Sequence, residues 1–279
     1  MRPGLDGQRI VLFESRLAEE ISGLVRRAGG VPVCVPAVVE RRRPSAPEVA
    51  TLLAELTVAE SPVVVFSTGV GARAFFDEAR ALGWAPELLD ALARGCAVCR
   101  GPKAVAALHR EGVVSSLRAR SPYTTAELIG ALGGLEVRRR MVAVVHYGER
   151  SEALVEALVA RGAVLRELLL YQWELPADTA PLAAAAEELL HGAFAAAAFT
   201  TQVQARNLMA VAGRMGRREA LVAALRSRVV VAAVGPTCAR VLAELGVPAD
   251  VVPEVPRMGA MLDALVARLR SSQGAGSAA

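Results

Sequence analysis

The chain has 279 residues, of which 53% are hydrophobic and 22% charged, and its formal net charge at pH 7 is +4. This length accommodates one large domain or two ordinary ones with a sizeable hydrophobic core. The basic side chains form no dense tract with interleaved aromatics, and the apolar runs are short and broken by Gly, Pro or charge, so we expect no nucleic-acid partner and no membrane partner. The first residues lack the pattern of a signal peptide, which predicts a cytoplasmic protein.

Apolar segments alternate with segments of helical periodicity along the first half of the chain. Prolines keep the second apolar segment extended and exclude a helix there. Ser45 has the position of an N-cap, and Glu48 follows at the capping-box spacing, so a helix is expected to begin at this point. The strands predicted in this half cover 9–15, 31–39, 62–67, 96–99, 141–146 and 163–173, and the helices cover 15–28, 45–56, 71–83, 102–112 and 151–162.

The same alternation continues beyond Pro176. Strands are predicted at 193–199 and 229–234, and helices at 180–192, 203–213, 219–228, 237–246 and 258–270. The last nine residues, 271–279, have nothing to bury and are expected to form a disordered tail.

Strands that are continuously apolar and alternate with helices indicate parallel sheets covered by helices on both faces. The number of strand–helix units exceeds what one compact doubly wound sheet holds. The sequence therefore predicts an α/β protein with two lobes.

The cysteines and histidines do not predict a metal or redox site. Cys96 and Cys99 form a C-x-x-C, but it lies inside an apparent strand, where alternation sends the two side chains to opposite faces. Cysteine in such a place usually behaves as a small hydrophobe. The three histidines are scattered without metal-ligand spacing. We therefore expect no metal requirement.

Small and hydroxyl-bearing residues follow most of the predicted strands. In α/β sheets, ligands bind outside the carboxyl ends of the strands, where helix N-termini offer free N–H groups to anions. Gly69 and Gly71 match the first two glycines of a dinucleotide fingerprint, but Ala74 replaces the third, so a nucleotide cofactor is disfavoured. The residues that stand at these strand ends are Ser67, Thr68, Gly69, Gly71, Arg100, Tyr147, Gly148, Thr200, Thr201, Gly235, Thr237 and Cys238.

Several motifs occur in a characteristic order: "ESR" at Glu14–Arg16, "FSTGVGARAF" at Phe66–Phe75, "HYGERSEALVEALVARGAVLRELLLYQWELP" at His146–Pro176, "FTTQVQARNL" at Phe199–Leu208 and "VAAVGPTCARVLAELGV" at Val231–Val247. In this order and spacing the chain resembles the uroporphyrinogen-III synthase family. The resemblance covers nearly the whole chain.

The resemblance implies two flavodoxin-like α/β lobes, each with a parallel sheet flanked by helices, joined by a two-stranded linker. Mapped onto this sequence, residues 1–36 and 175–270 would form one discontinuous lobe and residues 43–167 the other. Residues 37–42 and 168–174 would be the linker crossings. The ligand would lie between the lobes and face the strand ends.

The family's reaction closes the linear tetrapyrrole hydroxymethylbilane into uroporphyrinogen III, with inversion of the last pyrrole ring and loss of water, in tetrapyrrole and heme biosynthesis. The resemblance implies a lyase whose small-molecule partner is the linear tetrapyrrole, and we expect a monomer without cofactors. It implies that Tyr171 assists the leaving hydroxyl, and that Arg16 and the strand-end residues named above bind substrate. No His or acidic pair is evident at the strand ends, which favours Tyr171 as the donor.

Each of these proposed roles has a simpler structural alternative. Tyr171 could simply pack at the lobe junction, Arg16 could balance surface charge, and the threonines and Ser67 are also suited to be helix N-caps. Cys238 stands where the family often has a second hydroxyl. A non-catalytic tetrapyrrole-binding or regulatory protein on the same fold is the alternative function, because a fold alone does not fix an activity.

Overall fold

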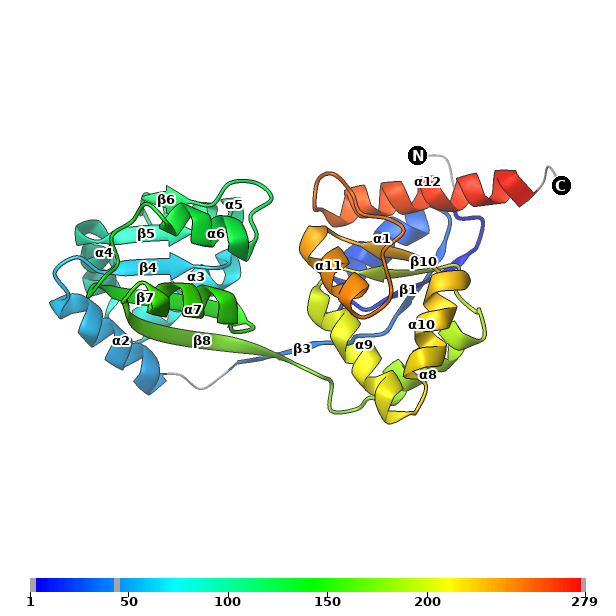
Figure 1. Cartoon of the computed structure of the whole chain (residues 1–279), viewed down its shortest axis with the longest axis horizontal. Helices are drawn as coiled ribbons and strands as arrows, with labels where there is room; N and C mark the ends of the chain where they lie inside the picture. Colours follow the sequence, from blue (N-terminus) through cyan, green and yellow to red (C-terminus); the bar gives the residue numbers. More distant parts are fainter. Residues whose placement is uncertain (1–3, 43–45, 277–279) are drawn as a thin grey trace. The chain divides into compact units, whose positions relative to one another are not determined.

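The computed structural model of the chain describes residues 4–42 and 46–276 (Figure 1). The chain divides into two compact units: unit 1 comprises Met1–Val39 and Glu174–Ala279, and unit 2 comprises Glu40–Trp173. Each unit has its own sheet with helices on both faces, so the predicted two-lobed α/β fold with parallel sheets is confirmed.

Unit 1 is built on a four-stranded parallel sheet in the order β10-β9-β1-β2. Helices α1 and α12 cover one face of this sheet, and α8, α9, α10 and α11 cover the other. Phe13 and Phe199 stack in the second of these layers, with ring centroids 4.8 Å apart. The elements are β1 (Arg9–Leu12), α1 (Ala18–Arg27), β2 (Val31–Cys34), α8 (Ala180–Leu190), β9 (Ala196–Phe199), α9 (Gln202–Arg214), α10 (Arg218–Ser227), β10 (Val230–Ala233), α11 (Pro236–Glu244) and α12 (Met258–Gly276).

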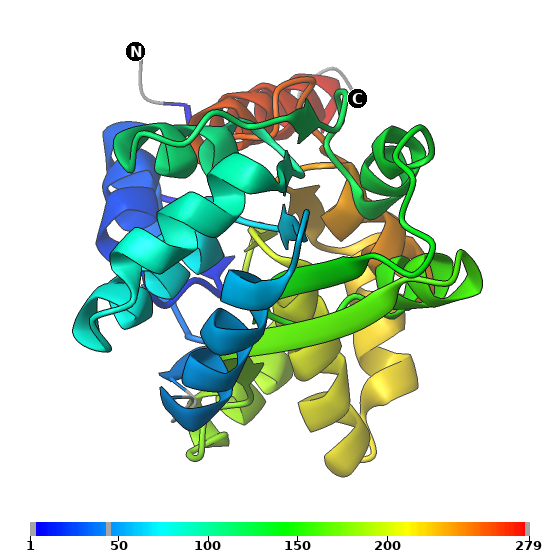
Figure 2. The same cartoon turned by 90° about the vertical axis from the view of Figure 1, so that its left-hand side faces the viewer.

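Unit 2 is built on a six-stranded sheet in the order β3-β8-β7-β4-β5-β6, and the strands from β8 to β6 are parallel. Helices α2 to α5 cover one face, and α6 and α7 cover the other (Figure 2). The elements are β3 (Val39–Arg42), α2 (Ala46–Val58), β4 (Val63–Phe66), α3 (Gly69–Ala81), α4 (Ala85–Arg94), β5 (Cys96–Cys99), α5 (Pro102–Arg110), β6 (Leu117–Arg118), α6 (Thr125–Leu132), β7 (Met141–Gly148), α7 (Glu152–Ala160) and β8 (Val164–Glu174).

The central strands are apolar on both faces because helices bury both faces. Every residue of β4, β5 and β9 is buried. Within β5, Cys96 packs with the α6–α7 layer and Cys99 with the α2–α5 layer, so the C-x-x-C side chains do point to opposite faces. Both cysteines are free thiols.

The two units contain the same arrangement of four neighbouring strands, but the chain connects these strands in a different order. The spatial order β2-β1-β9-β10 in unit 1 corresponds to β8-β7-β4-β5 in unit 2. The sequence carries the same repeat: F-[ST]-T-x-V-x-A-R begins at Phe66 and at Phe199, and G-P-x₅-L-x₃-G-V begins at Gly101 and at Gly235. Residues at matching positions of the two sheets can therefore be compared directly.

Several elements differ from the sequence-based expectation. Helices α4 and α6 and the short strand β6 were not predicted. Helix α12 continues to Gly276, so residues 271–276 are helical where a disordered tail was expected, and 277–279 lie outside the described residues. The predicted N-cap Ser45 also lies outside the described residues. Within the described part of the chain, no helix is both long and apolar enough to cross a membrane.

Candidate functional site

Parallel pairing brings the carboxyl ends of the strands to one edge of each sheet, and the predicted site residues follow these ends. In unit 1, β9 ends at Phe199, paired with Ala233 of β10. In unit 2, β4 ends at Phe66, paired with Cys99 of β5. The turns after these strands therefore lie side by side within each unit, and we call the two rows the unit 1 edge and the unit 2 edge.

A polar cluster at the unit 1 edge is satisfied by its own members. Glu14, which is 9% exposed, accepts hydrogen bonds from the Thr200 hydroxyl, from Nε2 of Gln204 at 3.3 Å and from the Leu17 N–H at 3.3 Å. The Oε1 atom of Gln204 accepts the backbone N–H groups of Thr200 at 2.7 Å and Thr201 at 3.2 Å. The Thr200 hydroxyl and the backbone N–H groups of Thr200 and Thr201 are thus used within the protein, whereas the buried Thr201 hydroxyl has no hydrogen-bond partner among the described residues.

The turn after β10 contains one buried and one exposed candidate. Cys238 is 3% exposed, its thiol lies 3.7 Å from the carbonyl oxygen of Phe199, and burial raises the pKa of this thiol to about 12. Cys238 is thus a buried core residue, and its contact with substrate stays a prediction. Thr237 is exposed, and Gly235 is buried against Pro256, whose Cβ would lie 2.8 Å from a Cβ at position 235.

Arg16 follows β1 and is exposed. Its side chain makes no hydrogen bond or ion pair with the described residues. The structure therefore leaves both the substrate-binding and the surface-charge interpretations of Arg16 in place.

The turn after β4 shows why threonine and glycine occur there. The Thr68 hydroxyl accepts the Gly71 N–H at 2.9 Å and caps α3, so the N-cap interpretation holds for Thr68. A Cβ at Gly69 would lie 2.3 Å from the Lys103 carbonyl oxygen, which shows how closely α3 approaches α5. Ser67 is half-buried at the end of β4.

A small basic pocket lies between the first turns of α3 and the length of α5, from Lys103 to the last residue of that helix, Arg110. Its volume is about 160 Å³, and Arg73, Lys103 and Arg110 contribute its charged side chains. The N-terminal ends of both helices add partial positive charge. The sequence did not single out these residues, although Lys103 is the only lysine of the chain.

Arg100, directly after β5, has an unusual environment for an arginine. Its backbone N–H donates to the Phe66 carbonyl at 3.1 Å, which fixes the residue at the unit 2 edge. The side chain is half-buried, and burial lowers the pKa of the guanidinium. Among the described residues it has no hydrogen-bond or ion-pair partner. A partly desolvated cation without a counter-ion is destabilising, and an anionic ligand would relieve this.

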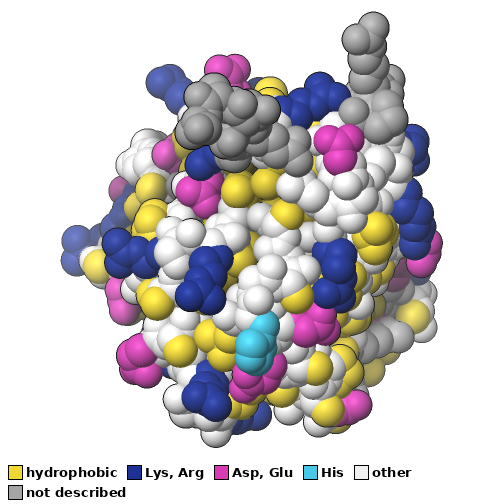
Figure 3. Space-filling view, turned by 90° about the vertical axis from the view of Figure 1, so that its right-hand side faces the viewer, with side chains coloured by type: hydrophobic (Ala, Val, Ile, Leu, Met, Phe, Trp, Pro, Cys, Tyr) yellow, Lys and Arg dark blue, Asp and Glu magenta, His cyan; other side chains and the backbone are white. Residues whose placement is uncertain are grey.

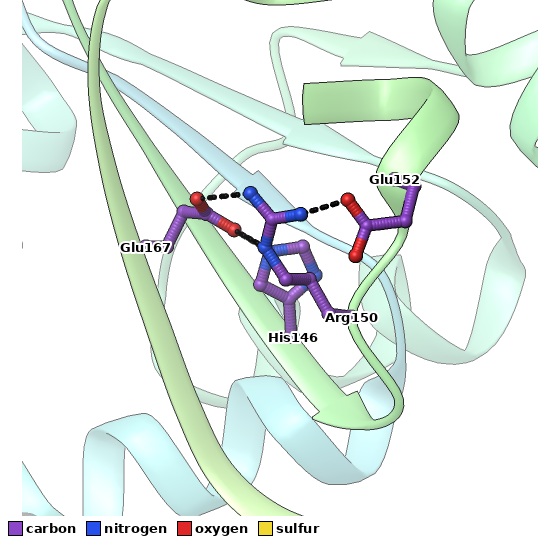
Figure 4. A network of polar contacts seen from close by, with 4 residues as sticks. All are labelled: His146, Arg150, Glu152 and Glu167. Carbon is purple, nitrogen blue, oxygen red and sulfur yellow. Dashed lines mark hydrogen bonds and ion pairs between the residues drawn. The ribbon is translucent and has the colours of Figure 1, made fainter. Parts of the chain in front are cut away.

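A second polar network at the unit 2 edge joins β7, α7 and β8 (Figure 4). His146 is 1% exposed, and its Nε2 lies 3.1 Å from Oε2 of Glu167. Arg150 binds both carboxylate oxygens of Glu167, at 2.7 and 2.8 Å, and also pairs with Glu152. Burial is the largest cause lowering the pKa of His146. The sequence analysis did not identify this His146–Glu167 pair, whose members both lie within strands.

Tyr171 lies on β8, beyond the level at which β4 ends. In the register of the sheet, Phe66 pairs with Val145 and Val145 with Leu168, three residues before Tyr171. Tyr171 is half-buried and packs against the core under α2 to α5. Its position fits both the donor and the packing interpretations.

The end of β7 is shaped by a glycine. Gly148 has φ +83°, and a Cβ there would lie 2.2 Å from the ring of Trp173. Gly148 is thus needed for the turn and for the close approach of the indole. The side chain of the neighbouring candidate, Tyr147, is outside the described part of the structure.

Another open cavity lies at the amino ends of the unit 1 strands. Its volume is about 440 Å³, and Gln8, Arg226, Arg228 and Asp250 are among its lining residues. Arg226 and Arg228 belong to the last turn and the C-cap of α10, where cations offset the negative end of the helix dipole. On the face shown in Figure 3, basic side chains are separated by apolar, acidic and uncharged surface. We therefore interpret these arginines as structural.

No group of three or more His, Cys, Asp and Glu residues that could hold a metal ion occurs among residues 4–42 and 46–276.

A family model described as uroporphyrinogen-III synthase HemD matches residues 19–263. The uncharacterized protein YjjA of Bacillus subtilis is 32% identical over 265 residues, covering 94% of this chain and 96% of the relative. A putative uroporphyrinogen-III synthase of Methanothermobacter thermautotrophicus is 36% identical over 132 residues, covering 47% of this chain and 51% of that protein.

Solved structures of uroporphyrinogen III synthases are similar to this chain in fold. A mutant of the Thermus thermophilus enzyme is similar with a TM-score of 0.78 at 27% identity, covering 95% of this chain and 100% of that one. The Helicobacter pylori protein, at 15% identity and a TM-score of 0.51, is similar in fold alone. The match of the family model over most of the sequence shows that the chain belongs to the uroporphyrinogen-III synthase family.

Proposed function

We propose that this protein is an active uroporphyrinogen-III synthase, which cyclises hydroxymethylbilane with inversion of the last pyrrole ring and loss of water. The observation that carries the proposal is Arg100, a half-buried guanidinium at the unit 2 edge with no partner among the described residues. An anion from outside the protein would compensate the charge of such a cation. The linear tetrapyrrole has carboxylate arms on every ring and supplies such anions.

The unit 2 edge offers further positive charge for these arms. Arg73, Lys103 and Arg110 surround the small pocket between α3 and α5. Charge-assisted hydrogen bonds to carboxylates are stronger than neutral ones and fix the orientation of the bound group. Together with Arg100, these side chains hold the flexible substrate in one arrangement.

Positioning is the larger part of catalysis in this proposal. Loss of the terminal hydroxyl leaves a cation delocalised over the first pyrrole, and the reactive chain closes to the uninverted isomer unless it is held otherwise. Attack by the substituted carbon of the last ring forms a spiro intermediate. Fragmentation and reclosure of this intermediate leave the last ring inverted, and a proton is lost from the ring carbon at which it closes.

Tyr171 is the proposed donor to the leaving hydroxyl. It is half-buried on β8 beyond the end of β4, and its phenol donates a hydrogen bond from an uncharged group. A proton transferred to the leaving hydroxyl makes water the leaving group, and the proton released on ring closure restores the balance. We propose a cytoplasmic protein that acts as a monomer in tetrapyrrole biosynthesis.

The test is to incubate purified protein with freshly made hydroxymethylbilane and to separate the uroporphyrinogen isomers. We expect mainly isomer III, formed faster than isomer I arises without protein. A product dominated by isomer I at every protein concentration would reject the synthase activity. Binding of uroporphyrinogen III without turnover would support the alternative, a non-catalytic tetrapyrrole-binding protein.

A further inference from the structure

Tyr123 adopts a backbone conformation that bulky residues seldom adopt. Its φ is +62°, in the left-handed region where a side chain crowds the backbone. The Tyr123 N–H donates to the Arg120 carbonyl at 2.8 Å, and the next N–H, of Thr124, donates to Oε2 of Glu127 at 2.9 Å. The hydrogen bonds on both sides hold Tyr123 in this conformation. Conformations held in this way cluster at ligand sites, although they do not identify a ligand by themselves.

The loop places the Tyr123 ring against Gly101. A Cβ at Gly101 would lie 3.4 Å from Cβ and 3.5 Å from Cγ of Tyr123, so the ring occupies the space beside the missing side chain. Gly101 directly follows Arg100. β5 and β6 are neighbouring parallel strands, and Arg100 and Tyr123 both lie beyond their carboxyl ends. The fold thus brings a half-buried aromatic ring next to the residue that carries the unpaired guanidinium.

Both side chains lack a polar partner in the described part of the chain. The Arg100 guanidinium has no hydrogen bond or ion pair, and the Tyr123 hydroxyl has no hydrogen bond. An arginine binds a carboxylate with two parallel hydrogen bonds, and a tyrosine face packs against another flat ring. The two groups therefore suit a ligand in which a flat ring carries a carboxylate on a short arm.

We infer that Arg100 and Tyr123 form a subsite for one pyrrole ring of the linear tetrapyrrole, with the ring against Tyr123 and one carboxylate arm on Arg100. The inference rests on the proposed function, because it names the part of that substrate which the unit 2 edge holds. Tyr123 acts here as a positioning residue through its ring, and Arg100 through its charge.

One variant, Tyr123→Gly, distinguishes a ligand-binding role of Tyr123 from a purely structural role, because the two roles predict opposite results. Tyr123→Gly suits the positive φ and removes the ring. If the ring serves the ligand, this variant keeps or raises the melting temperature and loses affinity. If the ring only packs against Gly101, the variant loses stability and binds normally.

The experiment measures the KM for hydroxymethylbilane and, separately, the Kd for uroporphyrinogen III under anaerobic conditions. The variants are Arg100→Gln, Tyr123→Gly and Tyr123→Phe, and Arg226→Gln is the control on an exposed arginine outside the site. We expect KM and Kd to rise about tenfold or more for the first two variants, which corresponds to losing one good ionic or stacking contact. Tyr123→Phe should stay within about threefold of wild type, because the ring remains.

The outcomes separate this inference from the proposed function. An active wild type with unchanged KM and Kd in Arg100→Gln and Tyr123→Gly overturns the subsite and leaves the synthase activity standing. A wild type that binds uroporphyrinogen III without forming it, and loses that binding in the two variants, supports the subsite and rejects the activity. A wild type that neither binds nor turns over overturns both.

Discussion

The unit 1 and unit 2 edges occupy equivalent places in their sheets, yet their polar groups are used differently. In unit 1, Glu14, Thr200 and Gln204 bond to one another. In unit 2, the residue matching Val234 is Arg100, whose guanidinium has no partner among the described residues. A desolvated charge without a partner lowers stability. The polar groups of Glu14, Thr200 and Gln204 therefore stabilise the unit 1 edge. We propose that Arg100, unlike the paired His146, Arg150 and Glu167 of the unit 2 edge, is kept for a ligand.

The largest effect is expected from Tyr171→Phe at the unit 2 edge. All three tyrosines of the chain lie in unit 2, and Tyr171 is the proposed donor to the leaving hydroxyl. Loss of one general acid should lower kcat about 100-fold while the melting temperature stays unchanged. Isomer-resolved turnover and thermal melts measure the two properties. Wild-type kcat with a lowered melting temperature would make Tyr171 a packing residue.

The next effect is a loss of stability in Gly69→Ala. The added Cβ would lie 2.3 Å from the Lys103 carbonyl oxygen. This oxygen belongs to the backbone, which cannot move away as the end of a flexible side chain can. We expect the free energy of unfolding to fall by about 2 kcal/mol. In unit 1 the matching residue is Gln202, so Gln202→Ala is the control and should cost less than about 1 kcal/mol. Equal losses in urea unfolding would show that the two helix pairs are packed equally closely.

Glu14→Ala tests whether the unit 1 edge is structural. Removing the carboxylate leaves Thr200 and Gln204 without their shared acceptor, which should lower the free energy of unfolding by about 1–3 kcal/mol. Below the melting temperature, kcat/KM should change less than about threefold. Glu19→Ala, at an exposed position of α1, is the control. A large loss of kcat/KM in a stable Glu14 variant would assign the unit 1 edge to the substrate as well.

The smallest effect concerns pH and His146. Burial lowers the pKa of folded His146 below its ordinary value of 6.5, although Glu167 opposes the shift. Below about pH 6.5 the unfolded chain therefore binds a proton at His146 more readily than the folded protein does. The contribution of neutral, buried His146 to the free energy of unfolding is complete above about pH 6.5 and is lost as the pH falls. His146→Gln should flatten the dependence of unfolding free energy on pH between about 7 and 5. His191→Gln, on the exposed end of α8, should keep the wild-type slope.

The fold was predictable where one local pattern specifies an element. Strands buried on both faces appear as continuous apolar runs, and most helices show one apolar face. Helix α4 was missed because Gly83, in the link between α3 and α4, signalled the end of a helix, while no residue of this link signalled the start of a new one. The matching pair α9 and α10 was predicted, because its polar link is easier to recognise.

Residues of the candidate site were predictable only where their position relative to a single strand was sufficient to identify them. Arg100 was found because it directly follows an apolar strand. The His146–Glu167 pair was missed because 21 residues separate its members and only the pairing of β7 with β8 brings them together. The T-x-x-Q spacing of Thr201 and Gln204 could have shown that this turn satisfies its own N–H groups, since it is a capping-box spacing.

The central claim is that Arg100 is kept at the unit 2 edge for an anionic ligand, and Arg100→Val tests it most directly by giving this edge the residue that unit 1 has. The measurement is the melting temperature of wild type and variant, with and without uroporphyrinogen III. Without ligand the variant should be at least as stable as wild type, because an unpaired and partly desolvated charge is removed. With ligand its melting temperature should rise less than that of wild type. A variant that is less stable without ligand and gains as much from it as wild type would contradict the account.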